Sequence, residues 1–189
     1  MNKPTFFVLS LMLFLAQISF AQSSKNTLKP GRFELEIDPI AYMLKGYSVH
    51  GIYRINRMRF DLGVFGIEQP GAYTGNKDFT TYTQGVGGKI NYLLNAKQTW
   101  FAGIGGGYAD SQITLKETNT TQHLYNWSLG VLAGYRFYLL RNTRMNGLYL
   151  TPWASIDYNM PVNSVHFEGK TYLLKRWSVF PTIHIGYRF

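Results

Sequence analysis

The sequence contains no cysteine among its 189 residues. This absence excludes disulfide bonds, thiolate metal sites, cysteine nucleophiles and a lipoprotein anchor. No ligand spacing typical of zinc or calcium sites occurs either, so we expect no metal and no cofactor. Charged residues are scarce, at 15%. The only long apolar run, residues 6–20, is shorter than the ~20 residues that a membrane-spanning helix needs.

That apolar run instead fits the centre of a secretory signal peptide. Met1-Asn2-Lys3 supplies a short positive start, and Ser19-Phe20-Ala21 places small residues where a signal peptidase reads them. We therefore expect residues 1–21 to be a signal peptide that is removed before Gln22. A retained membrane anchor is the alternative, and the shortness of the run disfavours it.

The mature chain is long enough for one domain. Removing 21 residues from 189 leaves 168, and losing Lys3 leaves a formal charge of 18 minus 10, or +8. The basic residues are scattered and no nucleic-acid-binding motif accompanies them, so nucleic acid is not an expected partner. Aromatics at 16% and 19 glycines are typical of a membrane barrel.

The last thirteen residues alternate strictly between two faces. One face is apolar from Trp177 through Val179 and Ile183 to Phe189, and the other is polar except for Phe180. Because side chains alternate across a strand, this pattern predicts a two-faced strand that ends on the final residue. A soluble protein avoids such an apolar edge, whereas a closed barrel in lipid has no free edge.

Turn signals divide residues 32–189 into about eight such segments. We therefore predict an all-β, eight-stranded antiparallel up-and-down transmembrane β-barrel over residues 32–189, with residues 22–31 as a periplasmic N-terminal segment. Pro39 predicts a bulge in the first strand, and Lys45-Gly46 a tight turn. Long loops are expected to alternate with short turns: 69–78, 116–123 and 161–175 against 56–57, 95–98 and 141–146.

This asymmetry predicts the orientation of the barrel. Outer-membrane barrels have long loops outside and short turns in the periplasm, which places both termini in the periplasm. Aromatic residues are expected to form interfacial girdles at both rims. One rim is predicted to hold Phe33, Tyr53, Tyr92, Trp100, Tyr149 and Phe189, and the other Tyr82, Tyr108, Tyr125, Trp127 and Trp177.

The C-terminal sequence T-I-H-I-G-Y-R-F resembles the assembly signal of bacterial outer-membrane proteins, with Tyr187 and Phe189 at its aromatic positions and Ile185 in register with them. His184 stands where that signal usually has glycine. The whole chain resembles small eight-stranded barrels of the OmpA, OmpX and OmpW kind. The resemblance implies a bacterial outer-membrane location, outer-membrane lipids and lipopolysaccharide as neighbours, and the barrel-assembly machinery as a partner during biogenesis. It leaves the oligomeric state open.

The inward faces of the predicted strands carry ionisable residues that must pair in so narrow a barrel. This predicted lumen charge network comprises Glu34, Glu36, Asp38, Arg54, Arg59, Asp61, Lys89, Arg136, Asp157, His184 and Arg188. A bulge at Pro39 would set Glu36 opposite Arg54. Closing the last strand onto the first would bring Arg188 near Glu34 and His184 near Asp38. We interpret the network as a plug.

Three functional classes remain open. The first, which we favour, is a structural or surface-interacting barrel that acts through its loops. The second is a narrow channel for a small solute. The third is a lipid A-modifying enzyme, for which Ser155, Asp157 and His184 form one conceivable triad and Ser164, His166 and Glu168 a looser one. Register places His184 opposite Thr151, away from Ser155, so we predict no catalytic residues.

Overall fold

The computed structural model describes residues 32–139 and 146–189. The predicted signal peptide, the segment 22–31 and most of the turn 141–146 lie outside these residues. The described part of the chain forms nine strand segments and two short helices, α2 (Pro39–Met43) and α3 (Gly71–Thr74). The strands are β1 (Phe33–Ile37), β2 (Tyr47–Ile55), β3 (Met58–Gln69), β4 (Phe79–Leu93), β5 (Trp100–Leu115), β6 (Thr121–Tyr135), β7 (Phe137–Tyr138), β8 (Gly147–Pro161) and β9 (Trp177–Arg188).

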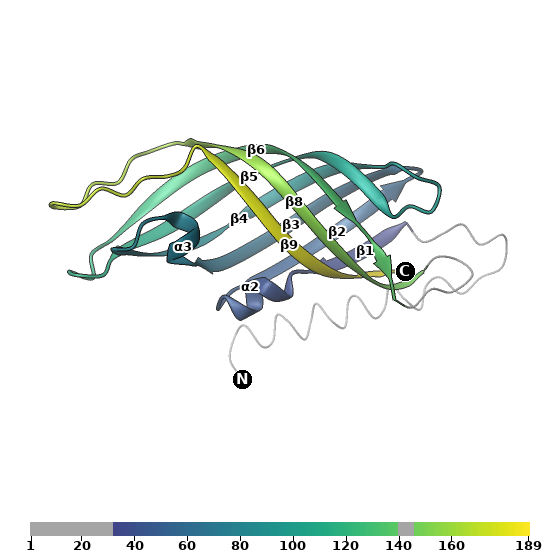
Figure 1. Ribbon diagram of the computed structural model, residues 1–189, viewed down its shortest axis with the longest axis horizontal. Coiled ribbons are helices and arrows are strands. Elements are labelled where there is room, and N and C mark those ends of the chain that lie inside the picture. The colour runs from purple at the N-terminus through teal and green to yellow at the C-terminus, as the bar shows by residue number, and fades with distance from the viewer. Residues whose placement is uncertain (1–31, 140–145) are drawn as a thin grey trace.

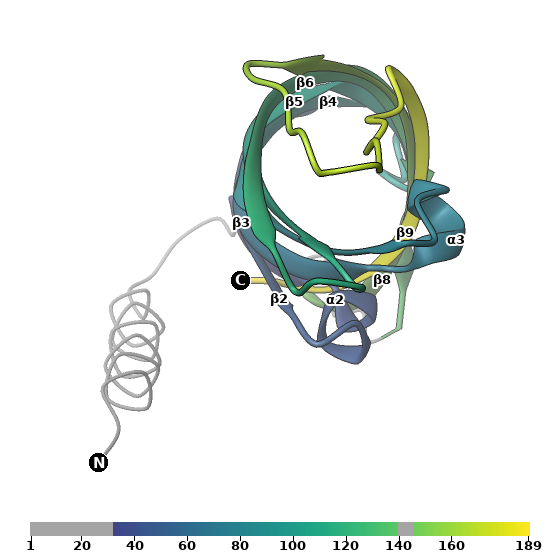
Figure 2. The ribbon, with the colours of Figure 1, turned by 90° about the vertical axis from the view of Figure 1, so that its left-hand side faces the viewer.

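The strands close into a ring in which every neighbour is antiparallel (Figures 1 and 2). The closing pair is β1 with β9, where Glu34 lies opposite Arg188. β7 continues β6, because both pair with β8 in one continuous register. The ladder is interrupted for two pairs, Tyr135 with Pro152 and Arg136 with Thr151, and Pro152 has no N–H to donate there. Counting β6 and β7 as one strand, the barrel has eight strands, which confirms the predicted fold class.

Alternation along the strands gives the barrel an apolar outside and a largely polar inside. The outward side chains near mid-strand are more than half exposed, as at Leu62, Leu129 and Val131. The inward residues that alternate with them, such as Arg59, Asp61 and Ser155, are buried. Because the period is two, each assigned strand presents the apolar face that the sequence predicted.

The prediction of a bulge at Pro39 is wrong, because the chain forms α2 there. The Asp38 carboxylate accepts a hydrogen bond of 2.8 Å from the Ile40 N–H, and Pro39 occupies the first turn, where its missing N–H costs nothing. Lys45-Gly46 then turns the chain into β2, as predicted. β1 is consequently only five residues long. No helix in the described part of the chain is long and apolar enough to cross a membrane.

The connections follow the predicted alternation only in part. The segment 69–78 is long and contains α3, and the connection after Pro161 is also long. The loop predicted at 116–123 is shorter, since β6 already begins at Thr121. There the ladder continues through polar pairs, including a 2.8 Å hydrogen bond between Thr114 and Thr121 hydroxyls. Apolar alternation does not mark this end of the ladder, because its outward positions, such as Thr114 and Thr121, are polar.

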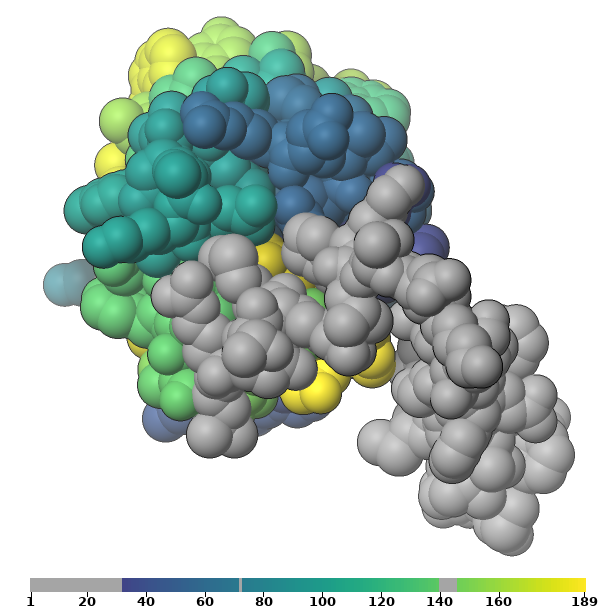
Figure 3. All heavy atoms as spheres, turned by 90° about the vertical axis from the view of Figure 1, so that its right-hand side faces the viewer, coloured from purple at the N-terminus to yellow at the C-terminus, as the bar shows by residue number. Residues whose placement is uncertain are grey.

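The long connection 162–176 folds across one mouth of the barrel (Figure 2). Its Val165, Phe167 and Tyr172 are buried against inward-facing residues of β4, β5 and β6. The opposite end carries the β2–β3 and β4–β5 turns, which lie side by side in Figure 3. The ends of β1 and β9 meet at this same end, where the Phe189 N–H donates to the Phe33 carbonyl at 3.1 Å.

Candidate functional site

The centre of the candidate site is the Glu34 carboxylate, which β1 directs into the barrel near the end where β1 begins. Its side chain is completely buried. Three arginine side chains from β3, the β6–β7 junction and β9 surround it. They are Arg59 (Nη2 to Oε2, 3.0 Å), Arg136 (Nη1 to Oε1, 3.1 Å) and Arg188 (Nη2 to Oε1, 2.7 Å).

Glu36 lies two residues further along the same face of β1. It receives a 2.6 Å hydrogen bond from Arg59 and is 3.0 Å from Nδ1 of His184. The Tyr149 hydroxyl lies 3.0 Å from both glutamates, and all these side chains are buried. We call these seven residues the charge cluster: Glu34, Glu36, Arg59, Arg136, Tyr149, His184 and Arg188.

A second group of charges lies beside the charge cluster. Asp61 of β3 is 2.8 Å from His50 Nδ1 and 3.1 Å from Lys89 Nζ. The ring of His50 contacts that of His184 with centroids 4.8 Å apart, so the two groups are continuous. Lys89 Nζ also lies 4.7 Å from the centre of the Trp153 ring, a cation–π contact.

Apolar side chains fill the remaining space around the charge cluster. Leu93, Phe101 and Leu132 form a buried group inside the barrel, and the Arg59 guanidinium lies 5.6 Å from the centre of the Phe101 ring. Taking charges out of water costs several kcal/mol each, so such a cluster is stable only when every charge is matched by good geometry. The short distances above meet that requirement.

The predicted pairs are only partly correct. Arg188 contacts Glu34 as predicted, and His184 Nε2 lies 4.0 Å from Asp38, although Glu36 is its nearer partner. The predicted Glu36–Arg54 pair is wrong. Because α2 takes its residues out of the ladder between β1 and β2, Glu36 lies opposite His50. Arg54 lies opposite Arg59 and donates to the Asn56 carbonyl at 3.1 Å.

Asp38 and Asp157 belong to the predicted network but not to the charge cluster. Asp38 caps α2 and accepts a 2.6 Å hydrogen bond from the Thr182 hydroxyl. Asp157 lies further along the lumen, where it accepts a 2.5 Å hydrogen bond from Ser155. No described cation lies within ion-pair distance of Asp157.

Sequence reasoning missed two members of the site. Tyr149 was assigned to an interfacial girdle, which is wrong, because it is fully buried among the glutamates. Its position between the outward Leu148 and Leu150 was the available signal, since alternation directs it inward. Alternation also directs His50 inward, between the outward Val49 and Gly51. A single histidine does not by itself indicate an ion pair, so the predicted network does not include His50.

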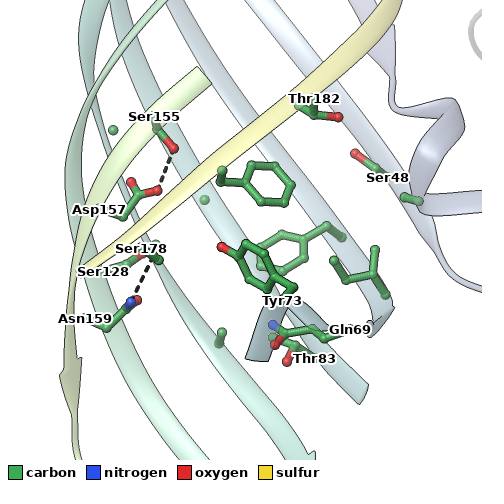
Figure 4. Close-up of a pocket in the computed structure, with 18 of the residues that line it drawn as sticks. Ser48, Gln69, Tyr73, Thr83, Ser128, Ser155, Asp157, Asn159, Ser178 and Thr182 are labelled. Carbon is green, nitrogen blue, oxygen red and sulfur yellow. Dashed lines mark hydrogen bonds between the residues drawn. The ribbon is translucent and has the colours of Figure 1, made fainter. Parts of the chain in front are cut away.

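Beyond the charge cluster the lumen opens into a cavity of about 430 Å³. Figure 4 shows Ser155, Asp157, Asn159 and Ser178 on one side of it and Tyr73 opposite. Its apolar lining includes Phe65, Leu132, Trp153, Phe180 and Leu174. The Tyr73 phenol lies on α3, and burial raises its pKa, so it is a neutral hydrogen-bonding group.

The two conceivable catalytic triads are not assembled. Ser155 hydrogen-bonds Asp157, whereas His184 faces Glu36 and lies opposite Thr151, as register predicted. Ser164 lies 3.1 Å from His166 Nε2 on the exposed connection, but no described carboxylate orients that ring. No group of three or more potential metal ligands occurs in the described residues.

No protein-family model matches the chain, and no curated protein matches it significantly. Among solved structures, the chain is similar to neisserial surface protein A (NspA), with a TM-score of 0.53 and 12% sequence identity. The match covers 83% of this chain and 97% of that one. At this identity the likeness concerns the fold, and it agrees with the small antiparallel barrel described above.

Proposed function

We propose that this chain is an integral β-barrel protein of the bacterial outer membrane. In this proposal the charge cluster seals the lumen, and the end that carries the connection 162–176 interacts with partners at the cell surface. The surface of the barrel supports the membrane location. Outward residues on β3, β5 and β6, such as Leu62, Ile104 and Val131, are apolar and 56–66% exposed, while the charges lie inside. Water would not favour this inverted distribution, whereas lipid does.

The charge cluster is the main observation in support of a sealed lumen. An eight-stranded barrel is only wide enough for side chains to fill it. Here three arginines, two glutamates, Tyr149 and His184 occupy one level together with Phe101 and Leu132. A conducting path would have to separate buried ion pairs that are 2.6 to 3.1 Å long. We therefore favour a surface role over a solute channel.

The opposite end of the barrel is the part available to partners. The connection 162–176 is held there by side-chain contacts to its neighbours: Asn163 donates to the His123 carbonyl at 2.7 Å, and Asn76 donates to the Leu173 carbonyl at 3.1 Å. Lys170 and Asp78 form a 2.9 Å ion pair on the same surface. An ordered outer surface suits recognition, and we propose lipopolysaccharide and outer-membrane lipids as its neighbours.

We assign no reaction to the barrel. Neither the Ser155–Asp157 pair nor the Ser164–His166 pair has the third group that would orient a general base. Mass spectrometry of lipid A from cells with and without the gene tests this assignment. Identical lipid A is expected, and a gene-dependent change in acylation would replace the surface role with an enzymatic one.

Single-cysteine labelling tests the proposed location and orientation, because the natural chain has no cysteine to interfere. Glu168→Cys lies on the connection 162–176 and Lys97→Cys on the β4–β5 turn, and both positions are exposed. We expect a membrane-impermeant maleimide to label intact cells through Glu168→Cys alone, and both variants after lysis. Labelling of intact cells only through Lys97→Cys would reverse the orientation, and recovery of the protein outside the membrane fraction would overturn the location.

A further inference from the structure

The ladder of paired strands is interrupted on one side of β9, where α2 contacts β9 in place of a strand. We call this interruption the gap. β1 ends at Ile37, which lies opposite Ile185, so residues 177–184 of β9 pair with β8 alone among the described strands. Pro181 lies in this stretch. Since the Phe189 N–H points to β1, alternation directs the backbone nitrogen of Pro181 to the same side. A residue without an N–H is suited to a strand edge that has no neighbour.

The cavity reaches this gap. Its lining includes Ile40 and Leu44 from the α2 segment, Pro181 and Thr182 from β9, and Ser48 from β2. Figure 1 shows α2 projecting from the barrel beside β9. The surface outside the gap is apolar, since Met43 is 83% and Val179 58% exposed. α2 contacts both β9 and β2 at this place, and Asp38 and Thr182 hydrogen-bond beneath it. The route for an apolar chain therefore runs between Ile40 of α2 and Pro181 of β9, which both line the cavity and are exposed on the surface.

The lining of the cavity is mixed. Phe65, Trp153 and Phe180 supply apolar surface, and the rings of Trp153 and Phe180 lie 5.9 Å apart. Ser128, Ser155, Asp157 and Ser178 supply a group of polar side chains (Figure 4). Cavities of about 300–1,000 Å³ with apolar walls and a few convergent polar groups are typical of small-molecule sites.

Asp157 is the carboxylate that the cavity offers to a polar group. Two lysines also line the cavity, but Lys89 is paired with Asp61 at 3.1 Å, and Lys175 donates to the Tyr73 carbonyl at 2.6 Å. The Asp157 carboxylate receives one hydrogen bond, from Ser155, and no described cation pairs with it. A half-buried carboxylate favours a ligand that donates hydrogen bonds and disfavours an anion. Asp157 lies opposite Ser178 on β9, two residues from Phe180 and three from Pro181, so the polar group and the gap are close along one strand.

We propose that the outer half of the lumen binds a single-chain amphiphile, with its hydrogen-bond-donating head at Asp157 and its apolar chain lying along Phe180 towards the gap beside α2. The shared chemistry of the head is an ammonium group or a sugar hydroxyl. The proposal rests on the membrane location given above. The charge cluster closes the cavity on the periplasmic side, so the ligand remains within the outer half of the barrel.

Trp153 reports on the cavity directly. The other three tryptophans, Trp100, Trp127 and Trp177, face outward, so replacing all three with phenylalanine leaves Trp153 as the sole tryptophan. This variant in phosphatidylcholine nanodiscs is titrated with undecylamine, undecyl glucoside and undecanoate, each brominated at the chain end. We expect the amine or the glucoside to quench Trp153 saturably and excess unbrominated compound to reverse the quenching. Undecanoate should bind about tenfold more weakly or not at all.

Three variants assign the binding to this cavity. Asp157→Asn should weaken binding of the preferred compound about tenfold, as expected for the loss of a charge-assisted hydrogen bond. Gly87→Leu directs a side chain into the cavity, where an added Cβ meets only an ordinary contact at 3.5 Å, and should abolish saturable quenching. Gly51→Leu is the matched control, because Gly51 faces outward and has open space.

Chain length tests the gap. At equal mole fraction in the bilayer, affinity should not fall from octylamine to hexadecylamine if the chain leaves through the gap. A sharp upper limit of chain length would contradict it. A correctly inserted, non-conducting barrel with no saturable quenching, or one whose quenching Asp157→Asn leaves unchanged, overturns this inference alone. A conducting barrel that still binds the amine would overturn only the proposed sealed lumen.

Discussion

Arg188, the penultimate residue, places its guanidinium 2.7 Å from the carboxylate of Glu34 on the first strand. This pair joins the two strands that close the ring, and it lies within a cluster of three arginines and two glutamates. Removing different members therefore leaves different charge balances. Glu34→Ala leaves three arginines facing one glutamate, whereas Arg188→Ala leaves two arginines facing two glutamates.

We predict that Glu34→Ala destabilises the barrel more than Arg188→Ala does. Breaking a buried pair costs ~3–5 kcal/mol, and the first change should lie at the upper end of this range and the second at the lower end. Urea unfolding in lipid vesicles measures both, with Arg188→Lys as the control that keeps the charge. Equal losses, or losses below about 1 kcal/mol, would mean that water reaches the cluster.

The corrected pairing of Glu36 gives a second prediction. A double-mutant cycle of Glu36 with Arg59, which are 2.6 Å apart, should show strong coupling in the free energy of unfolding. The cycle of Glu36 with Arg54 should show much less, because Arg54 faces the Asn56 carbonyl. Stronger coupling to Arg54 than to Arg59 would restore the arrangement that a bulge at Pro39 implies.

This pairing also marks where sequence reasoning ends. Alternation alone placed Glu34, Arg59 and Val131 on the correct faces, because a period of two is a local property. It did not fix the partner of Glu36, which depends on whether Asp38-Pro39 bulges or caps a helix. That choice depends on a hydrogen bond between side chain and backbone, and on tertiary contacts that no local pattern contains.

The cavity was equally hidden from the sequence. Phe180 stood out only as an exception to the polar face of β9, and Asp157 was assigned to the plug with the other charges. The role that we propose for both residues, binding an amphiphile, depends on the gap that the short β1 leaves beside β9. No residue pattern in the sequence predicts that gap.

The lipid-facing surface gives a third prediction. Val131 is 58% exposed and lies at mid-strand on the outside of β6. Val131→Arg should destabilise the barrel in bilayers by about 2–4 kcal/mol, the cost of an arginine at the membrane midplane. Val131→Leu is the control and should be nearly neutral. Equal stability of the two variants would mean that this face does not meet lipid.

The C-terminus gives a fourth prediction. Phe189 completes the closing ladder through its N–H, and its ring packs on Tyr187 with centroids 5.1 Å apart. We expect deletion of Phe189 to slow assembly and expose the chain to periplasmic proteases. The fraction of heat-modifiable barrel on gels measures this, with Trp177→Phe at the other end of β9 as the control. A normal barrel yield after the deletion would remove the assembly role from this residue.

The sealed lumen is tested most directly by single-channel recording of the wild-type barrel in planar bilayers at neutral pH. Insertion is verified beforehand by heat modifiability of the same preparation. With the charge cluster in place, no steady conductance steps are expected over prolonged recording, because ions would have to cross buried pairs of Arg59, Arg136 and Arg188 with Glu34. Reproducible, long-lived steps from the wild-type protein would contradict the seal and establish a channel.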